Sequence, residues 1–388
     1  MTGLRILLVA DMEPRRDSGA AGTEIELAEE LARQGHEVLC RWHDALPHRI
    51  GHWNLYHLLE QPRAMRGLIE RERERTAFDV FQVNQPAGWL AARQHRRNGC
   101  GGLFVHRSHG FEPRIGAVLT IWSRVYPEDR RPLHRRLASR LLSVLLARNY
   151  RGIVRYAEAH VVSCRECADD LARRGVLREQ IHVSPQVPTA DFLDSPAPEM
   201  TPKRLHRILY VGQHRFFKAP MIVAEVFNAL LSRNSELQAT WVCEPEAVEE
   251  VANRLAPDAR PRVEILPWQP RSTLLQIYDR HGLFLLPSFT EGFGKVFLEA
   301  MSRGACVVSA EQGGARDVIT PGVDGLLAPV GDVRGLVAAS EVLLADLEVA
   351  RGIGSEARRT AEAFTWLRIA RDLAAFYRER LEAKGVLE

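Results

Sequence analysis

The chain lacks any apolar run that approaches the length of about 20 residues needed to span a membrane. It also has no short internal repeat and no low-complexity segment. Its net charge of +3 is too small to indicate a nucleic-acid partner. With 46% hydrophobic and 26% charged residues, its composition is typical of a globular protein in water.

Cysteines are few and scattered, and only Cys164 and Cys167 have the spacing of a metal or redox pair. There is no second pair at metal spacing and no histidine cluster close to them in the sequence. Because this pair follows an apolar strand and opens a helix, packing of small residues is the alternative to metal or redox chemistry.

The N-terminal sequence MTGLRILLVADMEP has an apolar run too short for a signal peptide, and Asp11 follows it at once. This pattern predicts a buried first strand and a cytoplasmic protein.

Apolar, β-rich runs alternate with helix-period segments along the whole length of 388 residues, which predicts two doubly wound α/β domains. Five prolines between residues 184 and 203 indicate a linker between them. The predicted parts are an N-terminal domain (1–185), the linker (186–204), a C-terminal domain (205–365) and a terminal helix (366–388).

The segment PSFTEGFGKVFLEAMSRGACVVSAEQGGARDVI, residues 287–319, carries most of the functional information. It places Glu291 in a glycine-containing turn and Glu299 eight positions later, near the end of a helix that Gly304 is expected to cap. The turn leads into a helix N-terminus, where backbone N–H groups without helical partners can bind an anion.

The spacing of the two glutamates argues against a glycoside-hydrolase pair. Eight helical residues rise by about 12 Å, whereas hydrolases place their carboxyl groups about 5–9.5 Å apart. The two side chains are better suited to grip different parts of a long ligand, such as a nucleotide sugar with hydroxyls at both ends and a diphosphate between. The alternative is a surface helix with solvated glutamates.

This segment resembles the signature of retaining glycosyltransferases of the glycogen-synthase or group 1 type, family 4, which have the GT-B fold of two Rossmann-like domains facing across a cleft. The match extends through PS-x-x-EGFG, EAM-x-x-G, a VVS strand and GG. The resemblance implies that Glu291 and the backbone amides of Phe293, Gly294 and Lys295 hold the donor sugar, and that Glu299 holds the ribose. It also implies that the N-terminal domain binds the acceptor, that the C-terminal domain binds the nucleotide sugar, and that the terminal helix crosses back to the N-terminal domain.

The second half begins with YVGQHRFFK, a strand that leads into a glycine turn with basic side chains. A fixed cation there would stabilise the charge that develops on a diphosphate leaving group. Family members usually have Gly-Arg, then Lys-Gly a few residues later; here Gln213 replaces the arginine and Ala219 the second glycine. Lys218 keeps its place and Arg215 supplies a cation from a shifted position, the alternative being two solvated surface charges.

In the first half, Gly19 and Gly22 lie in a loop that opens a helix, and the resemblance implies that this loop flanks the donor phosphate and the acceptor. His109 follows the strand GLFVHRS, where the family has a His-Gly that reaches the donor sugar. His109 is therefore expected to contact the sugar or to transfer a proton; a satisfied histidine at a strand end, which suits His106 better, is the alternative.

Two further features concern ligand surfaces. Trp268 lies where the family places a loop against the nucleobase, and both base stacking and core packing would explain it. The segment between residues 101 and 155 contains eleven arginines and three acidic residues. Within Arg130–Arg155, Arg136 and Arg140 lie beside Leu137, Leu141, Val144 and Leu145 at helical spacing, which fits an amphipathic helix on an anionic membrane or lipid-linked acceptor. A core helix with a solvated basic face is the alternative.

The sequence thus predicts a retaining glycosyltransferase that moves a sugar from a nucleoside diphosphate sugar to a hydroxyl acceptor in glycolipid, lipid-linked saccharide or polysaccharide synthesis. The expected catalytic residues are His109, Lys218 and Glu291. The absence of an Asp-x-Asp element predicts metal independence, and no cofactor is expected. The rivals are a silent nucleotide-sugar-binding partner subunit and an epimerase on the same fold. Peripheral contact with the inner face of the membrane accompanies the predicted cytoplasmic location.

Overall fold

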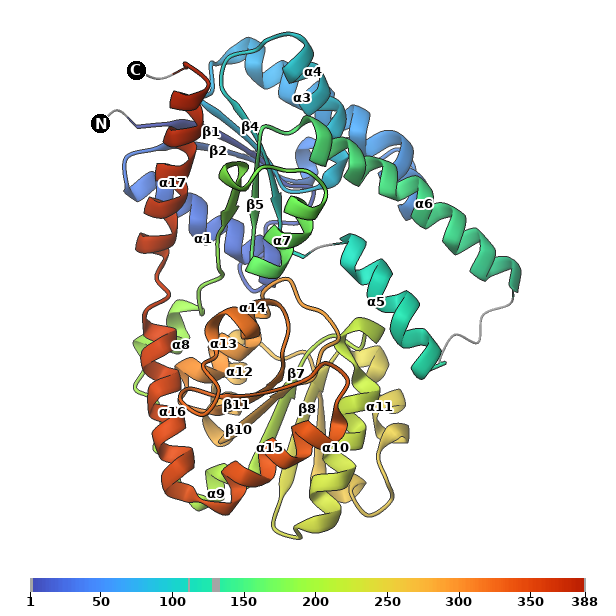
Figure 1. Ribbon diagram of the computed structural model, residues 1–388, viewed down its shortest axis with the longest axis vertical. Coiled ribbons are helices and arrows are strands. Elements are labelled where there is room, and N and C mark those ends of the chain that lie inside the picture. The colour runs from blue at the N-terminus through green and yellow to red at the C-terminus, as the bar shows by residue number, and fades with distance from the viewer. Residues whose placement is uncertain (1–2, 111, 128–132, 387–388) are drawn as a thin grey trace. The chain divides into compact units, whose positions relative to one another are not determined.

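The computed structural model describes residues 3–110, 112–127 and 133–386, with the backbone alone for 112–115, 119 and 133–143. The chain forms two compact units (Figure 1). Unit 1 comprises Met1–Pro185 and Trp366–Glu388, and unit 2 comprises Gln186–Thr365. Each unit is built on one parallel sheet of six strands, as the alternation of apolar runs predicts.

The sheet of unit 1 has the strand order β2-β1-β3-β4-β5-β6. Its strands are β1 (Arg5–Val9), β2 (Glu37–Arg41), β3 (Val80–Val83), β4 (Leu103–Ser108), β5 (Ala159–Val162) and β6 (Ile181–Val183). All residues of β3, β4 and β5 are buried, as expected for parallel strands covered on both faces.

Unit 1 contains the following helices in addition to this sheet. They are α1 (Gly19–Arg33), α2 (Trp53–Leu55), α3 (Gln61–Arg75), α4 (Trp89–Arg97), α5 (Glu112–Val125), α6 (Leu133–Tyr156), α7 (Arg165–Arg173) and α17 (Trp366–Ala383). The apolar stripe of α17 is buried against α1, where Leu373 and Tyr377 share a core with Leu27 and Leu31 (Figure 1). The C-terminal helix is therefore an integral part of unit 1.

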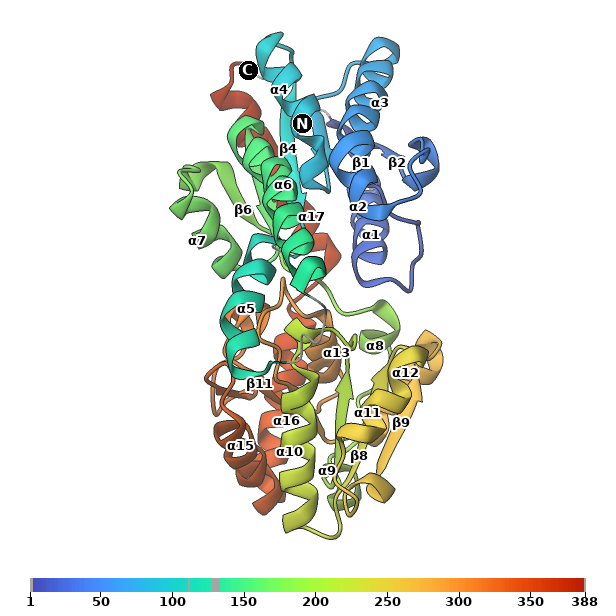
Figure 2. The ribbon, with the colours of Figure 1, turned by 90° about the vertical axis from the view of Figure 1, so that its right-hand side faces the viewer.

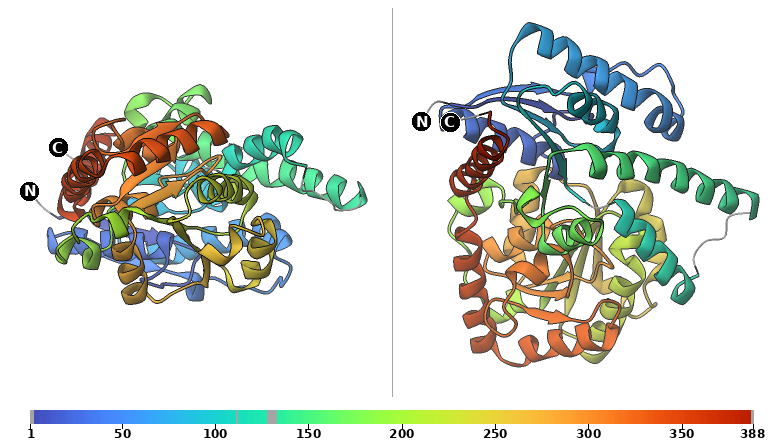
Figure 3. Two further views of the ribbon diagram at one scale, coloured as in Figure 1. Left: turned by 90° about the horizontal axis from the view of Figure 1, so that it is seen from below. Right: turned by 45° about the horizontal axis from the view of Figure 1, so that its top comes forward.

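Helices α5 and α6 extend away from the sheet of unit 1 (Figure 3). Of the basic stretch Arg130–Arg155, residues 130–132 and the side chains of 133–143, with Arg136 and Arg140, lie outside the described residues. Beyond them, Val144 and Leu145 are 61% and 40% exposed, while Tyr150 and Ile153 are buried in the core. The C-terminal half of α6 is thus a core helix whose preceding turn exposes apolar side chains.

Among the described residues, no helix combines the length and the apolar character required to cross a bilayer.

The sheet of unit 2 has the order β12-β11-β10-β7-β8-β9, so the direction of strand addition reverses between β10 and β7. Its strands are β7 (Arg207–Val211), β8 (Gln238–Cys243), β9 (Val263–Pro267), β10 (Leu283–Leu286), β11 (Cys306–Ala310) and β12 (Leu326–Ala328). Its helices are α8 (Ala190–Asp194), α9 (Pro202–Leu205), α10 (Pro220–Arg233), α11 (Val248–Arg254), α12 (Arg271–Arg280), α13 (Lys295–Ser302), α14 (Gly313–Val318), α15 (Val333–Ala345) and α16 (Leu347–Glu362). Helices α10 and α11 lie side by side (Figure 2).

The proline-rich segment 186–204, predicted as a linker, packs onto unit 2. The buried guanidinium of Arg303 donates to the carbonyl oxygens of Phe192, Ser195 and Pro196 at 2.7–2.9 Å. Arg358 donates to the carbonyl of Phe192 as well. Proline removes N–H donors but leaves every carbonyl available, so arginine side chains take the place of backbone pairing.

Helix α10 begins after Ala219, which has φ +54° and ψ +53° and is fully buried. Ala219 has the only positive φ of any non-glycine residue in the described chain. The left-handed conformation costs an L-residue about 1–2 kcal/mol. The position at which the family resemblance implies a glycine thus has the left-handed conformation with an alanine in it.

We expect Ala219→Gly to raise the free energy of unfolding by about 1 kcal/mol, because it relieves this strain. Denaturant unfolding measures the change. The matched control is Ala229→Gly within α10, where φ is helical and glycine should lower stability by about 1 kcal/mol. If both variants were destabilised alike, Ala219 would not be strained.

Candidate functional site

The candidate site lies at the carboxyl ends of β7 and β10, which are neighbours in the sheet of unit 2. The strand order reverses between these two strands, and open α/β sheets bind ligands at such a switch point. The loop after β10 carries Glu291, and the short 3₁₀ turn Phe216–Lys218 after β7 carries Lys218. The sheet topology therefore brings together two segments that are far apart in the sequence.

Glu291 and Lys218 form a direct ion pair. The ammonium of Lys218 donates to both carboxylate oxygens of Glu291 at 2.7 Å, and the Ser288 hydroxyl donates to Oε1 at 2.8 Å. The Glu291 side chain is 5% exposed and that of Lys218 is 19% exposed. An ammonium has three N–H donors, so the one that Glu291 does not take is available to an anion.

Two glycines allow the turn around Glu291 to fold tightly. A Cβ on Gly313 would lie 2.9 Å from the Glu291 backbone oxygen, and one on Gly314 would lie 2.5 Å from that of Phe293. Gly313 also has φ +53°, and Gly294, which precedes α13, has φ +90°. The GG that closes the signature therefore packs against its EGFG turn, which only residues without a side chain permit.

Glu299 lies on α13 and has different partners from Glu291. The Thr189 hydroxyl donates to its Oε1 at 3.2 Å, and the Glu299 side chain is buried. Burial, followed by the charge of Glu299, raises the pKa of the Tyr278 phenol well above its usual value, so Tyr278 stays a hydrogen-bond donor beside the carboxylate. The two glutamates thus belong to separate polar clusters.

The other predicted donor-site residues of unit 2 have varied surroundings. Phe293 is buried in the core, so its backbone alone can meet a ligand, and Lys295 begins α13. In the first turn of this helix, the N–H of Phe297 donates to the carbonyl oxygen of Gly294 at 3.0 Å. Arg215 is exposed and makes no ion pair with any residue that the structure describes. Trp268 is 44% exposed, so it does not belong to the core.

His109 lies in unit 1, directly after β4, and is held by a buried carboxylate that sequence reasoning did not identify. Its Nε2 lies 2.9 Å from Oε1 of Glu24, and Nε of Arg107 lies 2.6 Å from the same oxygen. Burial opposes the ionisation of Glu24, but the charges of Arg107 and His109 outweigh it and lower its pKa to about 2. The sequence feature that could have identified Glu24 is an acidic residue on the apolar face of α1, between Ala21 and Leu27.

Gly19 and Gly22 also lie in unit 1, at the start of α1. A Cβ on Gly22 would lie 2.4 Å from the carbonyl oxygen of Arg16, so Gly22 is required for the loop to fold. Gly19 has open space around its Cα, which leaves the N-terminus of the helix accessible. Of the predicted residues, the structure therefore places Lys218 and Glu291 in contact, Glu299 on the adjoining helix, and His109, Gly19 and Gly22 in the other unit.

Family models match both halves of the chain. The model described as Glycosyltransferase Family 4 matches residues 18–186, and the model described as Glycosyl transferases group 1 matches residues 206–346. The second range contains every candidate residue of unit 2, including the Lys218–Glu291 pair.

Curated relatives resemble parts of the chain. A D-inositol 3-phosphate glycosyltransferase from Kribbella flavida is 32% identical over 187 residues, which cover 45% of this chain and 44% of that protein. One from Corynebacterium kroppenstedtii is 24% identical over 298 residues, covering 71% and 62%. The first relatives are thus matched over less than half of their length.

Solved structures resemble the whole chain. Sucrose-phosphate synthase from Thermosynechococcus elongatus aligns with a TM-score of 0.71 at 21% identity, covering 98% of this chain and all of that one. The catalytic domain of starch synthase IV from Arabidopsis thaliana aligns with a TM-score of 0.69 at 12% identity, again over 98% of this chain and 100% of that one. With both family models matched and this architecture shared along its length, the chain belongs to the group 1, family 4 glycosyltransferases and has the GT-B fold.

Proposed function

We propose that the chain transfers a sugar from a nucleoside diphosphate sugar to a hydroxyl acceptor, with retention of the anomeric configuration. The observation that carries this proposal is the Lys218–Glu291 pair at the switch point of unit 2, beside the N-terminus of α13. It combines a fixed cation and helix amides for a diphosphate with a carboxylate for sugar hydroxyls. The names of the curated relatives and a solved HepE structure from Anabaena with UDP and glucose support the substrate class.

The proposed reaction breaks the bond between the anomeric carbon of the donor and its phosphate oxygen. The acceptor hydroxyl attacks the same face of the sugar, and the departing phosphate oxygen accepts the hydroxyl proton. The products are the glycoside and the nucleoside diphosphate. Lys218 stabilises the charge on the leaving diphosphate, which removes the need for a divalent ion at that position. Glu291 orients the donor sugar, Glu299 binds the ribose, and His109 contacts the sugar near its reacting carbon.

Donor turnover by the purified protein tests this function, with and without acceptor extracts. A transferase releases nucleoside diphosphate in an acceptor-dependent way. Release without acceptor would instead indicate an epimerase, and binding without turnover would indicate a silent partner subunit. A screen of nucleoside diphosphates and their sugars by thermal shift identifies the donor first.

The two glutamates should have separable effects. We expect Glu299→Gln to raise the Kd for the nucleoside diphosphate about tenfold or more, because a hydrogen bond to a charged group is lost. Glu291→Gln should change that Kd little and lower kcat about 100-fold, because the sugar contact matters most in the transition state. Calorimetry and initial rates measure the two quantities.

The matched control is Glu311→Gln, since Glu311 is an exposed acid of the same unit paired with Arg316. It should leave both constants unchanged. Unchanged kinetics and affinity in both the Glu291 and Glu299 variants would refute the assignment.

The acceptor is proposed to be lipid-linked or membrane-associated, with α5 and α6 as the contact. Ile121 and Val125 of α5 are each 60% exposed and Val144 of α6 is 61% exposed, within a segment rich in arginine. Exposed apolar side chains beside cations suit the interface of an anionic bilayer.

We expect the protein to cosediment with anionic vesicles, and Val144→Asp to weaken the binding several-fold, because a charge replaces an apolar side chain at the lipid surface. Val342→Asp is the control, since Val342 is 58% exposed on α15 of unit 2. Equal binding by both variants, or none by the unaltered protein, would contradict the proposed surface.

A further inference from the structure

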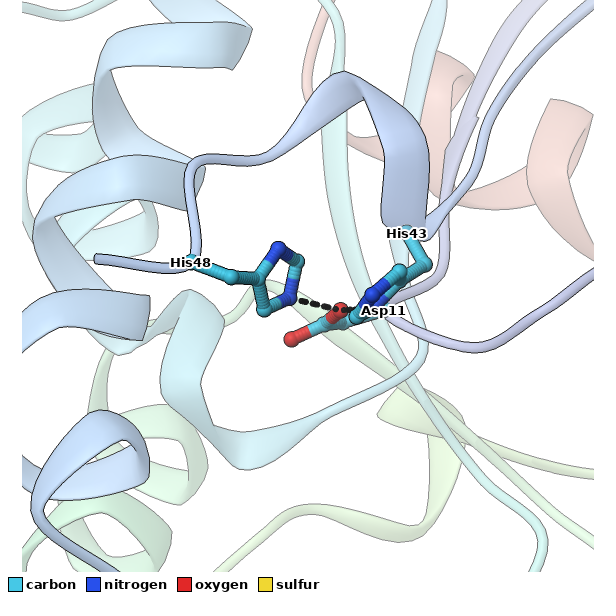
Figure 4. A group of neighbouring side chains, drawn as sticks. All are labelled: Asp11, His43 and His48. Carbon is cyan, nitrogen blue, oxygen red and sulfur yellow. Dashed lines mark hydrogen bonds and ion pairs between the residues drawn. The ribbon is translucent and has the colours of Figure 1, made fainter. Parts of the chain in front are cut away.

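Two histidines and an aspartate converge at the carboxyl edge of the sheet of unit 1 (Figure 4). Asp11 follows β1, His43 begins the 3₁₀ turn after β2, and His48 lies five residues further along the same loop. Because β1 and β2 are parallel neighbours, the segments that leave their carboxyl ends meet at the same edge. None of these three residues has a part in the proposed sugar transfer.

The distances within this cluster suit a small cation. Nδ1 of His43 lies 2.9 Å and Nε2 of His48 lies 3.2 Å from the same oxygen, Oδ1 of Asp11. One ligand atom from each residue lies within 4.8 Å of the others. Ligands of a tetrahedral zinc ion, bound at about 2.0–2.2 Å, are separated by roughly 3.3–3.5 Å. The two distances to Oδ1 of Asp11 are thus within about half an ångström of that separation.

A second layer of hydrogen bonds fixes the carboxylate. Oδ2 of Asp11 accepts from the Tyr56 hydroxyl at 2.7 Å and from Nε2 of Gln61 at 2.6 Å, which leaves Oδ1 directed at the histidines. The Asp11 side chain is 2% exposed, whereas those of His43 and His48 are 45% and 28% exposed. The carboxylate is therefore buried and oriented, and an ion from solvent can still reach the cluster past the histidines.

A hydrogen bond of His48 determines which of its ring nitrogens can bind an ion beside Asp11. Its Nδ1 lies 2.9 Å from the carbonyl oxygen of Leu46, which can only accept, so Nδ1 carries the proton. Nε2 is therefore the ring atom of His48 that can bind a cation beside Oδ1 of Asp11, from which it lies 3.2 Å away.

The position of His43 suits an ion shared with His48. The ring centroids of the two histidines are 3.6 Å apart, and each ring presents a nitrogen to Oδ1 of Asp11. One divalent ion bound by the carboxylate oxygen and the two nitrogens would satisfy all three groups at once. Metal-bound histidines commonly donate their second N–H to a backbone carbonyl, as Nδ1 of His48 does to Leu46.

We propose that Asp11, His43 and His48 bind a divalent transition-metal ion, Zn²⁺ in type, through Asp11 Oδ1, His43 Nδ1 and His48 Nε2, with solvent completing the coordination. Imidazole and carboxylate are ligands that zinc prefers. The ion links the loop after β2 to the end of β1. The proposal goes beyond the sugar transfer and does not rest on it, and the expected metal independence concerns the diphosphate held by Lys218 in unit 2.

The test uses the full-length protein, stripped of metal with a chelator, and Zn²⁺ as the probe. We expect one equivalent of Zn²⁺ to bind in calorimetry, to raise the melting temperature, and to be replaced by Co²⁺ with the absorption of a tetrahedral site. His43→Ala and His48→Gln should each weaken Zn²⁺ binding at least about tenfold, since even outer-shell changes cost that much. His52→Gln, an exposed histidine on the same loop, is the control and should bind as the unaltered protein does.

Far-UV circular dichroism of the stripped variants checks that they are folded, so that a loss of binding reports on the site. The Cys164–Cys167 pair, buried with sulfur atoms 3.3 Å apart, is the competing location, and Cys167→Ser addresses it. Binding that survives both histidine changes, that is lost in Cys167→Ser, or that occurs only at millimolar Zn²⁺ would overturn the proposal. None of these measurements requires sugar transfer, so failure of the transferase activity leaves their interpretation unchanged.

Discussion

The ion pair between Lys218 and Glu291 is the interaction on which the proposed donor site depends. A buried carboxylate is costly unless it is paired and hydrogen-bonded, and Glu291 is both. The pair exists because β7 and β10 are neighbours at the point where the strand order reverses. The close approach of Gly313 to the turn then keeps Glu291 in place. The topology of the sheet therefore brings the two segments of the site together, and the local sequence positions Glu291 within it.

In unit 1, too, the carboxylates of the polar clusters lie among hydrogen-bonding or cationic side chains. Glu24 is surrounded by Arg107 and His109, and Asp11 by Tyr56, Gln61 and two histidines. Burial opposes ionisation of Asp11, yet the hydrogen bonds from Tyr56, His43 and Gln61 lower its pKa, so it is an anion. Each cluster lies where parallel strands end, which is the edge at which this type of fold presents its polar groups.

Much of the fold could be predicted from the sequence because buried parallel strands are mostly apolar runs, as β1, β7, β10 and β11 are. The strands β6 and β12, with three residues each, are too short to give such a signal. The two glutamates of the candidate site could be selected from the sequence because their motif is local. The partners Glu24, Thr189 and Tyr278, and the meeting of Asp11 with His43 and His48, were not predicted, because tertiary contacts between distant segments carry no local pattern. The contacts of the proline-rich segment with unit 2 were not predicted either, because the carbonyl acceptors that Arg303 uses leave no pattern in the sequence.

The most direct test of the central claim asks whether the Lys218 ammonium, which is paired with Glu291 in the structure, binds a diphosphate. Lys218→Met, Glu291→Gln and the double variant are compared with the unaltered protein by thermal unfolding, with and without a panel of ADP, GDP, UDP and dTDP. The account predicts that at least one nucleotide stabilises the unaltered protein and Glu291→Gln, and that this stabilisation is lost in both variants that lack Lys218. Equal stabilisation of Lys218→Met and the unaltered protein, or no stabilisation of the latter, would contradict it.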